Sequence, residues 1–309
     1  MTLDLDPRRI EAARDWIDPV FLHTPQFRDP ALAAAVGCDL LVKVETVNPI
    51  GSFKARGVSV LARDLDPARI WVCSTAGNFG QALAYLGGER AATVDVFVSP
   101  GAPAYKVARM RALGARVEVS DDPGRAAREH AAAGDDRLLV IDGRDPAIAE
   151  GAGTIGLELA AAGPFDTVIV QIGDGALITG VACWLKSVAP RTRIVGVCAA
   201  GAPAMAQSFA AGRPIAVEGT GTIATALAIT RPVPESFARV VALVDDVVLV
   251  DDDELRHAAR LIAESLGLLV EPAGAAGVAA LLRHRDALRP RHAAVILTGA
   301  GGPGSGPWL

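Results

Sequence analysis

The sequence contains no uninterrupted apolar run of about eighteen residues, the length that a membrane-spanning helix needs. Its first twenty residues have neither a basic start nor the apolar core of a secretion signal. Positive charge is not gathered into a stripe: 30 basic residues stand against 35 acidic ones, for a net charge of −5. Proteins that bind nucleic acid usually show such a stripe. We therefore expect a soluble, cytoplasmic protein that binds neither membrane nor nucleic acid.

Cysteine is also scarce. The four cysteines lie far apart and form no C-x-x-C pair, and most are embedded in apolar runs; they are Cys38, Cys73, Cys183 and Cys198. This distribution is typical of small buried hydrophobic residues. We expect neither disulfides nor a metal site built from cysteine.

Short β-branched runs alternate with alanine-rich amphipathic stretches from about residue 69 onward. The predicted strands are 70–73, 94–98, 116–119, 138–141, 167–172, 193–197 and 293–298. Alternation of strand and helix predicts an α/β protein whose parallel sheets are buried on both faces. With 309 residues, 51% of them hydrophobic, the chain is long enough for two domains, and the turn-rich segment 142–154 is a candidate boundary.

Lys54 lies in the loop "NPIGSFKARG" (48–57), between a strand-like and a helix-like segment. A lysine is usually a solvated surface residue. A lysine that forms a covalent bond through its amine needs the neutral form, which burial among apolar neighbours favours. Both readings of Lys54 are open from its local sequence.

Three glycine-rich loops each follow a predicted strand: "STAGNFGQ" (74–81), "GDGALITG" (173–180) and "TGAGGPGSG" (298–306). The first two open helices, whose unpaired N–H groups suit an anion. Each loop also has a simpler explanation: a helix cap from Ser74 or Thr75, close packing, or a flexible tail. Together with Lys54, they supply the parts needed to hold pyridoxal 5′-phosphate and an amino acid.

Eight segments strengthen this interpretation. They are "HTP" (23–25), "KVETVNPIGSFKARG" (43–57), "STAGNFGQ", "EGAGTIGLEL" (150–159), "GDGALITG", "TIATALAI" (222–229), "EPAGAAGVAAL" (271–281) and "LTGAGG" (297–302). In this order they resemble the fold type II pyridoxal-phosphate enzymes of the tryptophan synthase β-like superfamily, in the threonine dehydratase and serine racemase branch. The resemblance implies two α/β domains, each with a mostly parallel sheet flanked by helices. The large cofactor-binding domain would comprise 1–65 and 143–309, and the small mobile domain that holds the substrate carboxylate would comprise 66–142.

The resemblance also implies a set of site residues. Lys54 would bind the cofactor covalently and act as the base at Cα, with Phe53 near the ring and Asn78 on the ring hydroxyl. The substrate carboxylate would be held by Ser74, Thr75, Ala76, Gly77, Asn78 and Phe79, with Thr75 in the place of the catalytic serine that leads this loop in the family. The phosphate would be held by Gly173, Asp174, Gly175, Ala176 and Leu177, and Thr298 would face the pyridine nitrogen.

Four departures from the family pattern bear on the reaction. Ala76 replaces the second serine of the racemases, so we expect elimination rather than racemisation. Phe79 stands where dehydratases usually have histidine. Asp174 interrupts the glycines of the phosphate loop, where its repulsion of a phosphate predicts that it points outward or meets a cation. The segment after Gly196 and Val197 offers Cys198 and small residues in place of carboxylates, so we expect no divalent metal there.

We therefore predict a pyridoxal-phosphate ammonia-lyase that eliminates water from a β-hydroxy amino acid such as threonine or serine, giving a 2-oxo acid and ammonia. One alternative is a β- or γ-replacement enzyme similar to cysteine synthase or threonine synthase. Another is a non-catalytic protein that binds the cofactor or an amino acid. The chain ends at Leu309, soon after the third loop, so we expect no C-terminal regulatory domain, and the resemblance implies a homodimer.

Overall fold

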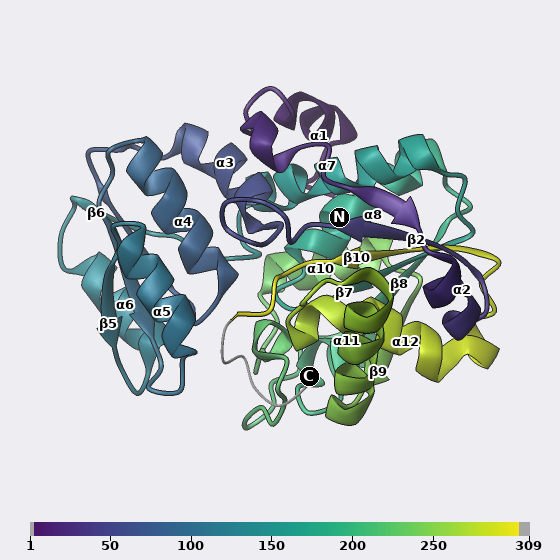
Figure 1. Ribbon diagram of the computed structural model, residues 1–309. Helices are drawn as coiled ribbons and strands as arrows, with labels where there is room; N and C mark the ends of the chain where they lie inside the picture. Colours follow the sequence, from purple (N-terminus) through teal and green to yellow (C-terminus); the bar gives the residue numbers. More distant parts are fainter. Residues whose placement is uncertain (1–2, 303–309) are drawn as a thin grey trace.

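The computed structural model describes residues 3–302 and contains two β-sheets flanked by helices (Figure 1). The larger sheet has the strand order β1-β2-β10-β7-β8-β9. Its strands are β1 (Gln26–Arg28), β2 (Asp39–Val44), β7 (Thr167–Gln171), β8 (Arg193–Ala199), β9 (Asp246–Val250) and β10 (His292–Leu297). Only the pairing of β1 with β2 is antiparallel. The expected α/β fold with mostly parallel sheets is confirmed.

The smaller sheet is entirely parallel, in the order β5-β4-β3-β6. Its strands are β3 (Ile70–Ser74), β4 (Val94–Val98), β5 (Arg116–Val119) and β6 (Arg137–Leu139). All four come from within 66–142, the range predicted for the small domain. The division into two domains at these limits remains a proposal, which the grouping of the strands supports.

Helices cover both faces of each sheet. In chain order they are α1 (Pro7–Ala13), α2 (Pro30–Val36), α3 (Lys54–Asp64), α4 (Asn78–Glu89), α5 (Ala104–Ala112), α6 (Pro123–Ala132), α7 (Pro146–Ala162), α8 (Ala176–Val188), α9 (Ala204–Ala211), α10 (Pro234–Leu243), α11 (Asp252–Leu266) and α12 (Pro272–Leu288). Four of them, α1, α2, α6 and α7, begin at an Asp-Pro pair in which the aspartate accepts a backbone N–H of the first turn. Proline in the first turn sacrifices no helical hydrogen bond, so this dipeptide is a strong local start signal.

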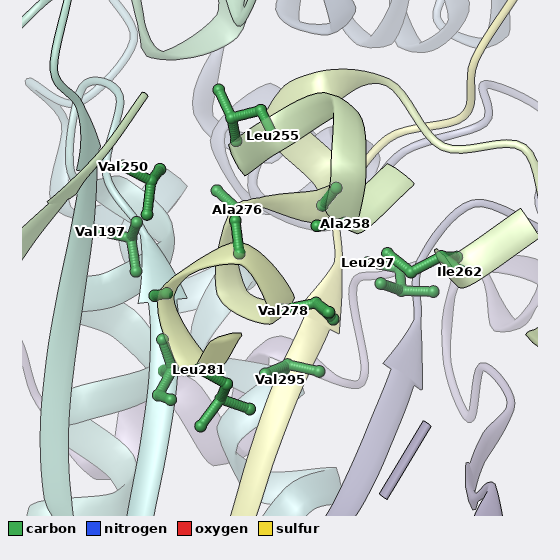
Figure 2. Packing of buried hydrophobic residues seen from close by; sticks show 14 of the residues in the cluster. Val197, Val250, Leu255, Ala258, Ile262, Ala276, Val278, Leu281, Val295 and Leu297 are labelled. Atoms are coloured by element: carbon green, nitrogen blue, oxygen red, sulfur yellow. The ribbon is translucent and has the colours of Figure 1, made fainter. Parts of the chain in front are cut away.

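The core of the larger sheet follows from the alternation of side chains along its central strands. In β10, Val295 and Leu297 pack with α11 and α12, whereas Ala294 and Ile296 face the layer of α7 and α8. Figure 2 shows the first of these layers; its labelled residues are Val197, Val250, Leu255, Ala258, Ile262, Ala276, Val278, Leu281, Val295 and Leu297. A strand that is buried on both faces is apolar at most positions, which explains the long apolar runs in the sequence.

Two strands, β1 and β9, were not predicted, whereas β2 is the strand-like segment expected before the loop of Lys54. In β2 the sequence "DLLVKV" is interrupted by Lys43, which is nevertheless fully buried because it donates a hydrogen bond to the carbonyl of Thr24 at 2.7 Å and pairs with Glu158. Strand β9 lies at the sheet edge between acidic residues, so its faces are only partly buried. The acidic residues around β9 obscure its apolar pattern in the sequence. Among residues 3–302, no helix is long and apolar enough to cross a membrane.

Candidate active site

A turn at 48–53 holds Lys54 at the first position of α3. Asn48 organises the turn: its side-chain oxygen accepts the N–H groups of Ile50 and Ser52, each at 3.2 Å. The same turn is joined to the segment that follows β10, because the N–H of Phe53 donates to the carbonyl of Thr298 at 3.2 Å. Lys54 therefore begins its helix beside the end of the central strand β10.

A buried ion network fixes α3 from the other side. Arg56 is completely buried; it contacts Glu45 at 2.9 Å and Glu158 at 2.6 Å, and Lys43 also pairs with Glu158. Charges are buried only where they are paired and hydrogen-bonded, so this network permits little movement of the helix. It lies one half-turn from Lys54 and so restricts where that side chain can point.

The amine of Lys54 contacts the carboxylate of Asp142, which follows β6 in the smaller sheet. Two rings also lie close: the amine is 5.0 Å from the ring centroid of Phe53 and 5.8 Å from that of Phe79. The Lys54 side chain is 16% exposed and that of Asp142 is 13% exposed. Lys54 is therefore not a solvated surface lysine, and its surroundings combine two aromatic rings with a carboxylate from the smaller sheet.

The loop from Ser74 to Gly77 joins β3 to α4. The N–H of Thr75 donates to the carbonyl of Phe97 at 3.0 Å, so the N–H groups that can bind an anion are those at the start of α4. Helix α4 has Gly77 as its N-cap, and no side chain caps it. The alternative in which Ser74 or Thr75 caps the helix is thus wrong; the hydroxyl of Thr75 instead accepts the N–H of Gly77 at 3.1 Å. Unpaired N–H groups and a positive dipole end suit a substrate carboxylate.

The loop after β7 has the same character. Gly175 is the N-cap of α8 with φ +96°, a conformation that favours glycine, and no side chain caps this helix either. A Cβ on Gly173 would lie 2.3 Å from the carbonyl oxygen of Ala226. Glycine is therefore required at both positions, and the first amides of α8 remain available for a phosphate.

Asp174 lies between these glycines and lines the cavity. Burial and the neighbouring Asp142 carboxylate raise the pKa of Asp174 to about 7, although the positive charge of Lys54 opposes this. The sequence predicted that Asp174 points outward or meets a cation. It lies near both a cation and a second carboxylate.

Thr298, at the end of β10, is buried, and its hydroxyl oxygen accepts the side-chain N–H of Gln171 at 2.8 Å. Since that oxygen is already an acceptor, the hydroxyl proton is available to another partner. A hydroxyl that donates suits an unprotonated ring nitrogen, the role that the resemblance implies for Thr298.

Glu271 connects the two sheets across the cavity. It is the N-cap residue of α12, which packs on the larger sheet. It accepts hydrogen bonds from the side chain of Asn78 at 2.8 Å and from Lys106 of α5 at 2.5 Å. The amide nitrogen of asparagine carries two protons, so Asn78 retains one for a ring hydroxyl. Glu271 therefore fixes the orientation of Asn78.

All fourteen residues that the sequence predicted for cofactor and substrate line one cavity of about 210 Å³: Phe53, Lys54, Ser74, Thr75, Ala76, Gly77, Asn78, Phe79, Gly173, Asp174, Gly175, Ala176, Leu177 and Thr298. The donors therefore fit pyridoxal 5′-phosphate: an amine, two uncapped helix starts and a hydroxyl with a free proton, all in one cavity. The individual roles remain predictions.

The sequence reasoning missed several residues of this cavity. Asp142, Gln171, Glu271 and the 3₁₀ segment Thr225–Leu227 also line it. Asp142 directly follows the predicted strand 138–141, and the carboxyl ends of parallel strands are where ligands bind, so that position was a usable signal. Glu271 opens a segment that carried the resemblance, but nothing in its local sequence indicated a partner in α5. Among residues 3–302, no group of three or more His, Cys, Asp or Glu is arranged to hold a metal.

Comparisons with known proteins agree with this geometry. A putative threonine dehydratase of Sinorhizobium fredii is 32% identical over 96% of this chain and 92% of its own length. A serine racemase of Oryza sativa subsp. indica is 34% identical over 90% of this chain and 84% of its own length. The structure of maize serine racemase superposes with a TM-score of 0.87 at 30% identity, covering 97% of this chain and 94% of the other. Dehydratases and racemases are thus about equally similar to this chain.

The match to a family model spans residues 17–299, which include both sheets and every predicted site residue. The end of the third glycine-rich loop, 303–306, lies outside the described residues. Lys54, the two uncapped helix starts and Thr298 line one cavity. The chain belongs to the family described as "Pyridoxal-phosphate dependent enzyme", with fold type II architecture and with threonine dehydratases and serine racemases among its homologues.

Proposed function

We propose that this protein is a pyridoxal-phosphate-dependent ammonia-lyase that removes water from a β-hydroxy amino acid of the serine or threonine type. The observation that supports it best is the cavity itself, in which Lys54, the Ser74–Phe79 loop, the Gly173–Leu177 loop and Thr298 come together from four separate chain segments. The products would be a 2-oxo acid and ammonia.

The bound cofactor would supply an electron sink conjugated to Cα of the substrate. The residues of this chain would do the rest. The amides at the start of α4 would hold the substrate carboxylate, and the amine of Lys54, steered by α3, would take the proton from Cα. Thr298, whose oxygen is occupied by Gln171, would donate to the ring nitrogen without giving it a full proton. A weaker electron sink favours prompt loss of a β leaving group over a long-lived carbanion.

Ala76 is the residue that favours elimination over racemisation. Racemases of this branch use a serine at this position to move a proton on the opposite face of Cα, and alanine has no proton to transfer. Ala76 lines the cavity beside Thr75, so a serine there would face the same space. The activity of this chain should therefore match that of the dehydratases among its relatives.

A turnover screen tests the proposal. The purified protein, loaded with cofactor, is incubated with L-serine, L-threonine, 3-hydroxyaspartate and phenylserine, and 2-oxo acids, ammonia, new amino acids and D-isomers are measured. We expect equal amounts of 2-oxo acid and ammonia, none from the Lys54→Ala variant, and little D-serine. The Ala76→Ser variant should gain interconversion of L- and D-serine.

Three results would contradict the proposal. A new amino acid formed only with a second nucleophile would identify a replacement enzyme. Sustained interconversion of L- and D-serine by the unmodified protein would identify a racemase. Failure of borohydride to attach the cofactor to Lys54 would indicate a protein that binds without catalysis.

A further inference from the structure

Two carboxyl groups, Asp142 and Asp174, lie together in the wall of the cavity although they come from different sheets. The segments that carry them are in direct contact: Gly143 has φ +79°, and a Cβ there would lie 3.0 Å from Cβ of Asp174 and 2.9 Å from its carbonyl oxygen. Both aspartates line the main cavity and also a second one of about 200 Å³. The pair therefore stands where the two cavities meet.

The pair is connected to the reactive amine. One oxygen of Asp142 accepts the hydrogen bond of Lys54, while its other oxygen, Oδ1, is buried and has no hydrogen-bond partner within residues 3–302. A buried carboxylate oxygen without a donor is uncommon. It is an available acceptor for a proton that moves between Lys54 and Asp174.

Like charges that line the same cavity wall disfavour each other's ionisation, so one carboxyl tends to keep its proton. Asp142 is the member stabilised as a carboxylate by Lys54, and burial together with Asp142 raises the pKa of Asp174 to about 7. The other charged groups nearby are arginines. Arg239 of α10 donates to the carbonyls of Gly143 at 3.0 Å and Arg144 at 2.8 Å, so it is already engaged.

The second nearby arginine is Arg128 of α6, which lines the second cavity and is exposed to solvent. Ser236 of α10 hydrogen-bonds only the backbone carbonyl of Asp174. Within the described residues, the Asp174 carboxyl therefore forms no ion pair, whereas the Asp142 carboxylate pairs with Lys54.

Building on the proposed dehydration, we propose that Asp174 is the acid that protonates the departing β-hydroxyl, and that Asp142 passes to it the proton that Lys54 removes from Cα. The Cα–H bond breaks and its proton goes to the Lys54 amine. The Cβ–O bond breaks with its electron pair on oxygen, which takes the Asp174 proton and leaves as water. Lys54 then returns its proton through Asp142 to Asp174. No oxidant or further reactant is needed.

This role also explains an acidic residue in a phosphate loop. A protonated Asp174 places no negative charge beside the phosphate, and a phosphate bound at the start of α8 would further disfavour its ionisation. The loop could thus hold both groups without repulsion. The cofactor should bind the Asp174→Asn variant at least as tightly as it binds the unmodified protein.

A comparison of two leaving groups tests the proposal. L-Serine must lose hydroxide or water, so its elimination needs an acid, whereas β-chloro-L-alanine loses chloride, which needs none; both yield pyruvate. In the Asp174→Asn variant, kcat/KM for serine should fall about 100-fold or more, and that for β-chloroalanine should change less than about threefold. Asp142→Asn should show the same selectivity to a smaller extent. Asp253→Asn is the control: its side chain is exposed on α11, and the change should affect neither substrate.

Two further readouts separate proton transfer from a structural role. Cofactor affinity, measured by absorbance titration, should be retained in Asp174→Asn. In the unmodified protein, serine turnover should fall as the pH rises above about 7, because Asp174 loses its proton, and β-chloroalanine turnover should lack this fall. An equal loss of activity with both substrates, or weaker cofactor binding that accounts for the loss, would overturn the proton-transfer role of Asp174 but not the proposed dehydratase function. If the unmodified protein eliminates from neither substrate, the proposed function is wrong and this proposal falls with it.

Discussion

Replacing Lys106 by methionine should destabilise the protein substantially, because the change breaks a buried ion pair that joins the two sheets. Lys106 is 2% exposed and Glu271 is 7% exposed, with 2.5 Å between the paired atoms. Coulomb's law gives about 7 kcal/mol of attraction at this distance for an effective dielectric of 20. Desolvation of both charges offsets much of it, and leaving one buried charge unpaired usually costs about 3–5 kcal/mol.

The assay is urea unfolding at pH 7, followed by circular dichroism, for the unmodified protein and the Lys106→Met variant. We expect the free energy of unfolding to fall by about 3–5 kcal/mol. The double variant Lys106→Met/Glu271→Gln should recover part of the loss, because a neutral glutamine keeps an acceptor for Asn78 and leaves no charge unpaired. Arg256→Met is the control: its partner Asp253 is 91% exposed, so the change should cost about 1 kcal/mol or less.

The pH dependence provides an independent check. Burial lowers the pKa of Lys106, but Glu271 and Tyr105 outweigh burial and raise it above 10.5. A raised pKa in the folded state means that the stabilisation is complete below pH 10.5 and is lost as the pH rises through the raised value. The difference between the unmodified protein and Lys106→Met should therefore shrink above pH 10.5. A loss below about 1 kcal/mol at pH 7 would refute the reasoning, since the pair would then be no better than an exposed one.

Two further predictions concern the ion network and the phosphate loop. Burial opposes ionisation of Glu158, but Arg56 and Lys43 outweigh burial and lower its pKa from 4.5 to about 2. This carboxylate therefore contributes stability that is present above pH 4.5 and is lost as the pH falls toward 2. In unfolding titrations, Glu158→Gln should remove about 3 kcal/mol of the acid dependence of stability, and an unchanged dependence would contradict the role of the network. Gly173→Ala should weaken cofactor binding at least tenfold in absorbance titrations. The reason is that the alanine Cβ would lie 2.3 Å from the carbonyl oxygen of Ala226, so the loop must shift. Tight cofactor binding by this variant would show that the phosphate lies elsewhere.

The parts of the site that sit at strand ends could be predicted from the sequence. Each glycine-rich loop follows an apolar run, and in an α/β protein the carboxyl ends of parallel strands share one edge of the sheet. Local chemistry therefore indicated where Lys54, Thr75, Gly173 and Thr298 would gather, and the cavity contains all of them. The alternation of strands and helices indicated the fold for the same reason: burial on both faces leaves a pattern that is readable over a few residues.

Only the tertiary structure revealed the charges that the two sheets bring together. Asp142 contacts Lys54 from 88 positions away, and Glu271 contacts Lys106 across 165 positions. A charged residue in a sequence is by default a solvated one, and its burial becomes favourable only through a partner whose position depends on how the layers pack. The sequence alone therefore predicted the proposed cofactor site and its lysine, while the packing of one sheet against the other decided which carboxylates surround that lysine.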